Sequence, residues 1–93
     1  MGFQNFEELE VWEKALELKI EISQLARTFP QEEKYRLTDQ LITSSRSVNS
    51  QIAEGHGRKT WPDRLRFCVI ARGSLTEILN HLIDAFDDKY INE

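Results

Sequence analysis

Three segments of the chain place apolar residues at alternating intervals of three and four, and this period strongly limits the fold. In the first segment the series is Val11, Ala15, Leu18, Ile22, Leu25 and Phe29. An average interval of 3.5 residues keeps one face of an α-helix apolar, as in helical bundles. No stretch of five residues keeps the apolar and polar alternation of a half-buried strand. The sequence therefore predicts an all-α fold.

Two breaks divide the chain into three long helices, which we expect at about residues 7–28, 31–54 and 61–86. Pro30 ends the first, because the residue before a proline is pushed out of the helical region. Gly55 and Gly57 end the second, where a glycine commonly adopts a left-handed conformation. Thr60 suits an N-cap for the third helix. Ninety-three residues are enough for one typical domain, so we expect residues 1–93 to form a single domain.

The first helix carries a second apolar stripe beside the first, made of Phe6, Leu9, Trp12, Leu16 and Ile20. One interpretation places both stripes inside a single wide core, and the other turns one stripe toward a neighbouring subunit. The third helix is similarly broad. Its expected inner stripe is Leu65, Cys68, Ala71 or Arg72, Leu75, Ile78, Leu82 and Phe86, widened by Phe67, Ile70, Leu79 and Ile83. We assign Trp12, Leu16, Ile20 and Phe67 to core or subunit contacts.

The inner face of the second helix is expected to contain Leu37, Leu41, Ser44 or Ser45, Val48 and Ile52. Its serines either let another helix approach closely or face water on a weak helix. Gly73, in the third helix, costs about 0.5–1 kcal/mol relative to alanine. This cost is best explained if something packs against the gap that the glycine leaves.

The formal net charge of −4 is unevenly distributed. Residues 46–80 carry six basic and three acidic side chains, and the basic ones are Arg46, Arg58, Lys59, Arg64, Arg66 and Arg72. The overall acidic charge argues against a protein that coats nucleic acid along its length. The basic middle segment is still compatible with a local contact to an anionic group. The chain shows no membrane-spanning run and no signal peptide, and its single cysteine, Cys68, permits no internal disulfide. We therefore expect a cytoplasmic protein, with Cys68 as a small core residue rather than a nucleophile.

Few residues suggest chemistry. His56 and His81 are the only histidines, and no second ligand pair completes a zinc or di-iron site. We expect no catalytic residue, no metal and no cofactor. The segment after Gly55 and Gly57 has two interpretations. In one, its exposed backbone amides and the following helix start bind a phosphate. In the other, it is an ordinary turn between helices. Glu54 and Glu77 are expected to form salt bridges across the bundle, and a paired-carboxylate catalyst is the alternative.

Four blocks of the sequence carry a family resemblance. They are Phe6-Glu-Glu-Leu9-x-Val11-Trp12-x-Lys14-Ala15, Phe29-Pro30-x-x-Glu33-x-Tyr35-x-Leu37-Thr38-x-Gln40-Leu41, Ser47-Val48-x-x-x-Ile52-Ala53-Glu54-Gly55-x-Gly57-Arg58 and Gly73-Ser74-Leu75-x-Glu77. In this order and spacing the chain resembles the four-helix-bundle family of the bacterial 23S ribosomal RNA intervening-sequence proteins. The accessory proteins of diversity-generating retroelements are similar.

The resemblance implies an antiparallel, up-down helical bundle that assembles into a homopentamer and catalyses no reaction. It also implies a structural role for Ile52, Ala53, Glu54, Gly55, Arg58, Gly73, Ser74 and Glu77. Retroelement relatives bind nucleic acid and serve a reverse transcriptase. Gln51 stands where the family usually has asparagine, and the chain is acidic, unlike the retroelement accessories.

The sequence stops near Tyr90, where the family's fourth helix would begin, so we expect three helices with the fourth missing or truncated. Apolar surface left on the first and third helices would then favour association. The leading hypothesis is a homo-oligomeric scaffold or interaction protein, with no membrane contact. The alternative is an accessory protein that binds RNA or DNA, with a partner such as a reverse transcriptase. It would use the basic surface of Arg46, Arg58, Lys59, Arg64, Arg66 and Arg72.

Overall fold

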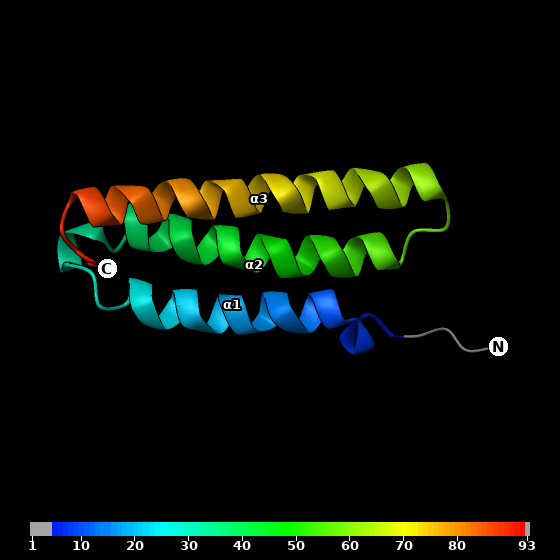
Figure 1. The fold of residues 1–93 in the computed structure, drawn as a ribbon, viewed down its shortest axis with the longest axis horizontal. Helices are drawn as coiled ribbons and strands as arrows, with labels where there is room; N and C mark the ends of the chain where they lie inside the picture. The colour runs from blue at the N-terminus through cyan, green and yellow to red at the C-terminus, as the bar shows by residue number, and fades with distance from the viewer. Residues whose placement is uncertain (1–4, 93) are drawn as a thin grey trace.

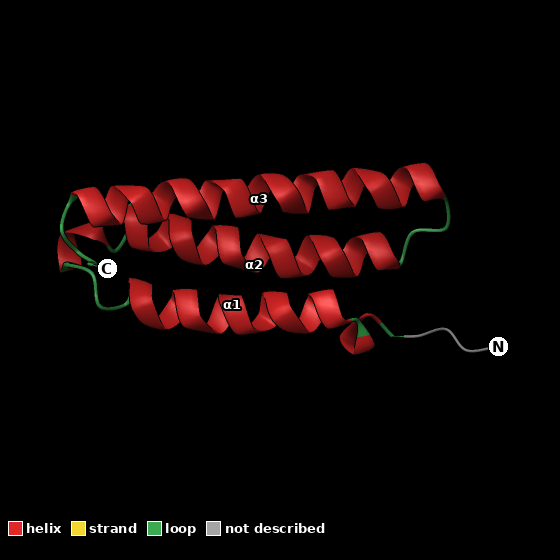
Figure 2. Cartoon of the chain, in the orientation of Figure 1, coloured by secondary structure: helices red, strands yellow, loops and turns green. Residues whose placement is uncertain are grey.

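The chain folds into three long helices, as the apolar period predicts, and they run antiparallel, as the resemblance implies (Figures 1 and 2). The computed structural model describes residues 5–92. The elements in chain order are the 3-10 turn η1 (Phe6–Glu8), α1 (Glu10–Ala26), the 3-10 turn η2 (Gln31–Glu33), α2 (Leu37–His56) and α3 (Trp61–Asp87). The described residues contain no strand, and the molecule measures 50 × 23 × 21 Å. The prediction of an all-α helical bundle is confirmed.

Helix α2 is the centre of the fold. Both α1 and α3 pack against it, whereas no Cα of α1 lies within 8 Å of a Cα of α3 among the described residues. The three helices therefore occupy three corners of a bundle. The backbones of α1 and α3 stay apart on either side of α2, and a groove remains between them.

Apolar side chains from all three helices fill the core. Leu41 and Ala26 are fully buried, and Ile22, Val48 and Ile78 are nearly so. The predicted inner face of α2 is found where the sequence placed it, because one face of α2 meets both of its neighbours. On α1 the outcome is mixed, since one member of the predicted series, Val11, is 57% exposed.

The serines of α2 allow the close approach of α3. Ser44 and Ser45 are buried, and Ser44 donates a hydrogen bond of 2.7 Å to Glu77 of α3. Ser74 Oγ lies 2.9 Å from Ser47 Oγ, which adds a second polar contact between the two helices. The small side chains therefore lie between helices, and the weak-helix alternative is wrong for Ser44 and Ser45.

Two helix ends differ from the expectation. Helix α2 begins at Leu37 rather than near Gln31, because Arg36 has φ −122° and ψ −106° and separates η2 from α2. Gly55 lies inside α2, and Gly57 has φ −79°, so the predicted left-handed stop is wrong. The chain leaves α2 through right-handed backbone instead. The predicted N-cap of α3 is present, since the Thr60 hydroxyl accepts a hydrogen bond of 3.3 Å from the Asp63 amide.

The register of α3 also differs. Its buried residues are Phe67, Ala71, Ile78 and Ala85, whereas the predicted core residue Cys68 is exposed. Leu65, Leu75 and Phe86 of the predicted stripe are 46%, 44% and 48% exposed. The prediction is confirmed for Ile78 and for the Ala71 alternative, which are buried, and Leu82 packs against the core. Only the other members of the predicted stripe turn away from α2.

The chain after α3 folds back over the opposite end of the core. Lys89 has φ +65°, a left-handed conformation that reverses the chain. The Tyr90 amide then donates to the Ala85 carbonyl at 2.9 Å, and the Tyr90 ring lies 5.5 Å from that of Phe29. Tyr90 and Ile91 thus cover the core where α1 ends.

Candidate interaction surfaces

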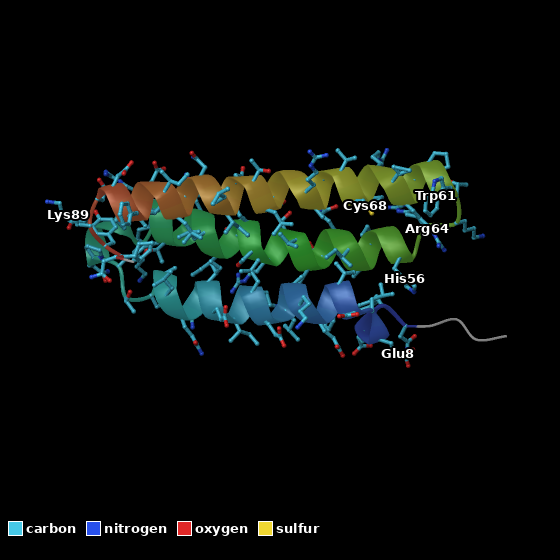
Figure 3. All side chains as sticks on the ribbon, viewed as in Figure 1. Glu8, His56, Trp61, Arg64, Cys68 and Lys89 are labelled. Carbon is cyan, nitrogen blue, oxygen red and sulfur yellow. The ribbon has the colours of Figure 1, made fainter. Side chains whose placement is uncertain are left out.

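An apolar groove lies between the start of α1 and the first half of α3, with α2 as its floor. It encloses about 380 Å³. Its lining is Leu9, Val11, Val48, Gln51, Ile52, Gly55, His56, Trp61, Arg64, Cys68, Ala71, Arg72 and Leu75. Figure 3 shows Trp61, Arg64 and Cys68 on the part of α3 nearest the α2–α3 turn, with His56 of α2 at the same end. The groove is a surface for apolar side chains with a basic edge from Arg64 and Arg72.

Helix α3 exposes most of the large apolar side chains that face solvent. Of eleven such residues in the described chain, eight lie on this helix. They are Trp61, Leu65, Val69, Ile70, Leu75, Leu79, Ile83 and Phe86. Scattered apolar residues are normal on a protein surface, but a concentration of them on one helix suggests an interaction surface. Sequence reasoning placed Leu65, Leu75 and Phe86 on the inner stripe and Ile70, Leu79 and Ile83 beside it. It assigned no stripe to Trp61 or Val69.

The turn between α2 and α3 is built around the Phe67 ring. The Arg58 and Arg66 guanidinium groups lie 4.6 and 5.2 Å from the ring centroid, within the range of cation–π attraction. Arg58 also pairs with Glu54 at 2.8 Å, and its carbonyl accepts from Arg64 Nε at 2.8 Å. Gly55 admits the ring, since a Cβ there would lie 3.0 Å from Phe67 Cβ. Arg58 is therefore a structural residue of the turn.

The six basic residues do not gather on one surface. Arg58, Lys59, Arg64 and Arg66 surround the α2–α3 turn, and Arg72 lines the groove. Arg46 instead lines a separate depression between α1 and α2, of about 330 Å³, together with Lys19 and Arg27. None of the described residues lining this depression is acidic. Sequence reasoning missed Lys19 and Arg27, because the first half of the chain is acidic overall and only folding brings them beside Arg46.

Glu54 and Glu77 do not form a carboxylate pair. Glu54 pairs with Arg58, four residues later, so the expected salt bridge across the bundle is wrong for Glu54. Glu77 accepts from Ser44, ten residues before Glu54 on α2. Ten residues of helix span about 15 Å. Within residues 5–92, no three His, Cys, Asp or Glu side chains are grouped so that they could hold a metal ion. Nor is any of the described helices long and apolar enough to cross a bilayer.

The turn and the polar contacts between α2 and α3 are built by the residues that carry the family resemblance. The sequence profile of the family described as "23S rRNA-intervening sequence protein" matches residues 7–93. The chain belongs to this family. In this intervening-sequence protein, Glu54, Gly55 and Arg58 build the turn. Ser74 and Glu77 connect α3 to α2. A search of curated proteins finds no match to the chain.

Proposed function

We propose that this intervening-sequence protein is a non-catalytic scaffold that works as a homo-oligomer. The observation that carries the proposal is that α3 holds eight of the eleven exposed large apolar side chains in the described residues. Burying a large apolar side chain contributes roughly 1.5–3 kcal/mol relative to leaving it in water. A chain of this size buries only about 60–65% of its unfolded surface, so contacts between copies add needed stability.

Two observations favour a protein without catalytic activity: its family, and the contacts made by the carboxylates of Glu54 and Glu77. Glu54 and Glu77 are both engaged in contacts that hold the fold, so neither is poised as a general acid or base. The single cysteine and the family resemblance favour the cytoplasm as the compartment.

Light scattering coupled to size-exclusion chromatography tests self-association. The mass at micromolar concentration is expected to be a multiple of 10.9 kDa, and the resemblance leads us to expect five copies. The variant Leu79→Lys tests the role of α3. Leu79 is 59% exposed, so this change should leave the folded monomer intact. It should nevertheless weaken the association of copies. A monodisperse monomer for the unmodified chain would contradict the proposal.

A second candidate function is contact with RNA or DNA, with or without a protein partner such as a reverse transcriptase. The depression lined by Lys19, Arg27 and Arg46 favours it, because three cations with no acidic side chain among the lining residues suit a phosphate backbone. Such contacts carry no sequence information and weaken steeply with salt.

Fluorescence anisotropy of labelled RNA and DNA at several salt concentrations tests this candidate. Arg46→Ala is expected to weaken binding and to reduce the salt dependence by about one phosphate contact. Lys59→Ala is the matched control at the α2–α3 turn, and Arg58→Ala is unsuitable because Arg58 stabilises that turn. No binding at low salt would leave the scaffold as the sole candidate.

A further inference from the structure

Two depressions of opposite charge lie on either side of α2. The basic one, between α1 and α2, contains Lys19, Arg27 and Arg46. The other lies between α2 and α3, encloses about 370 Å³ and has no lysine or arginine in its lining. Its lining residues are Asp39, Gln40, Thr43, Ser44, Glu77 and His81. Neither depression shares a lining residue with the apolar groove between α1 and α3, so both belong to other sides of the bundle.

Three residues of α3 form a row along the acidic depression. Ile70, Glu77 and Asp84 are seven residues apart, so they lie on one side of the helix, and all three are exposed. The hydrogen bond from Ser44 to Glu77 shows that this side adjoins α2. Because α3 runs antiparallel to α2, Glu77 is level with position 44 of α2. Ile70 is then level with about position 51, and Asp84 with about position 37.

A comparable row lies on α1, along the basic depression. Trp12 and Lys19 are seven residues apart, and Lys19 and Arg27 line the same depression. Asn49 donates a hydrogen bond of 3.3 Å to the Trp12 carbonyl, and Thr38 donates one of 3.2 Å to the carbonyl just before Arg27. These contacts make Trp12 level with about position 49 of α2, Lys19 with about position 43 and Arg27 with about position 37.

The two rows match in level and in character. Each extends over fourteen or fifteen residues of helix, roughly 21 Å. Near the α2–α3 turn both rows present an apolar side chain, and at the two other levels a base in one row corresponds to an acid in the other. The matching residues are Trp12 with Ile70, Lys19 with Glu77 and Arg27 with Asp84.

We propose that the α1–α2 side of one copy docks on the α2–α3 side of the next copy, head to tail, with the helices of the two copies side by side. This inference rests on the self-association in the proposed function and names an interface for it. A rotation about an axis parallel to the helices keeps every residue at its own level, so it brings the matching residues of the two rows together. Since the two surfaces differ, every copy offers both, and the contact repeats until a ring closes.

Charge selects this arrangement over its alternatives. Two copies that met through the same depression would place like charges against each other. A copy turned end for end would place Arg27 at the level of Ile70 and Trp12 at the level of Asp84. Exposed ion pairs contribute little individually, so they act mainly on which surfaces meet and in which direction. Burial of apolar surface favours the contact as well, because Ile70 is 42% exposed.

Charge reversal at Arg27 and Asp84 tests the docking. Neither residue forms an ion pair with another described residue, so the fold does not depend on their charges. Arg27→Glu and Asp84→Arg are each expected to shift the mass in light scattering toward the 10.9 kDa monomer. The double variant carries both changes and should recover the mass of the unmodified protein, because each reversed surface then meets a reversed partner. High salt should weaken the association of the unmodified protein.

Two controls match these changes in charge. Lys59→Glu lies in the α2–α3 turn and Glu21→Arg lies on α1, and both positions are exposed and line neither depression. Both variants should keep the unmodified mass. An equimolar mixture of Arg27→Glu and Asp84→Arg should associate although each alone does not, which shows that the two positions meet between copies. Circular dichroism of each variant checks that the helices are retained.

The outcomes separate this inference from the proposed function. Loss of mass in both single variants and its recovery in the double variant support the head-to-tail contact. An oligomer that neither single variant affects overturns the contact, while self-association through another surface stands. Loss without recovery in the double variant also overturns it. Weaker binding of labelled RNA by Arg27→Glu at unchanged mass would assign the basic depression to nucleic acid and overturn the inference. A monomeric unmodified chain overturns both.

Discussion

Ser44 of α2 donates a hydrogen bond of 2.7 Å to the carboxylate of Glu77, which lies 33 residues later on α3. Ser44 is buried, with 4% of its surface exposed, so water competes only weakly for its hydroxyl. A hydrogen bond to a charged group is stronger than one between neutral groups, although exposure of Glu77 weakens this one. The contact stabilises the packing of α3 on α2.

We expect Ser44→Ala to lower the free energy of unfolding by about 1 kcal/mol, because Glu77 then loses its donor. Chemical denaturation measures the change. Ser50→Ala is the matched control, since the exposed Ser50 hydroxyl bonds only within its own helix, at 3.2 Å to the Ser47 carbonyl. A double-mutant cycle with Glu77→Gln should show coupling between the two sites. An equal effect at Ser44 and Ser50 would contradict the interpretation.

Alanine at the two helical glycines is expected to act in opposite directions. At Gly55 a new Cβ would lie 3.0 Å from Phe67 Cβ, and overpacking of this kind costs about 1–3 kcal/mol. At Gly73 no described atom of a neighbouring element lies within 4 Å, so alanine should stabilise α3 by about 0.5–1 kcal/mol. Thermal unfolding compares the two variants. If both were stabilised, the Phe67 side chain would have to move away from the new Cβ at little cost, which would contradict the expected overpacking.

Arg58 and Lys59 are adjacent cations with different roles. Arg58→Ala removes the ion pair with Glu54 and the contact with the Phe67 ring, and we expect a loss of about 1 kcal/mol. Lys59→Ala, at an exposed position in the turn, should change stability by less than about 0.5 kcal/mol. Denaturation of the two variants in parallel measures the difference. Equal losses would argue against the structural role of Arg58.

Tyr90 should make the stability of the protein fall at alkaline pH. Partial burial raises the pKa of Tyr90 above its ordinary value, and the nearby carboxylates of Glu33, Asp88 and Glu32 raise it further. The unfolded chain therefore loses this proton first as the pH increases. Stability from Tyr90 is complete below about pH 10 and is lost as the pH rises toward the higher pKa of the folded state.

The alkaline loss of stability is expected to be smaller in Tyr90→Phe, which cannot ionise at this position. Denaturation curves at neutral and alkaline pH measure it, and phenolate absorbance follows the titration directly. Glu33→Gln should lower the pKa of Tyr90, because it removes a neighbouring charge and an acceptor of the Tyr90 hydroxyl. An unchanged alkaline slope in Tyr90→Phe would assign the loss to other groups.

The heptad interval predicted the three helices, but it did not decide which stripe of α3 faces inward. Cys68 and Leu75 fit the seam interval, and Phe67 and Ala71 fit the packing on α2 equally well. Only the path of α2 beside α3 decides between them, and that is a tertiary property. The N-cap at Thr60 could be predicted locally, because its hydrogen bond joins residues three apart. The serines of α2 indicated a thin helix face, but their partners on α3 are 27 and 33 residues away and depend on the fold. The depression of Lys19, Arg27 and Arg46 could not be predicted locally either, because it joins two helices.

The central position of α2 has a consequence for how the molecule opens. Helix α1 and helix α3 each depend on α2, and their backbones do not contact each other. We therefore expect each outer helix to open at a lower free energy than the whole molecule unfolds, even though all three share one core cluster. Such partial openings appear as separate cooperative units in native-state hydrogen exchange. Amides in the middle of α2, around Leu41 and Val48, should exchange only through global unfolding, whereas those of α1 should exchange at a lower free energy.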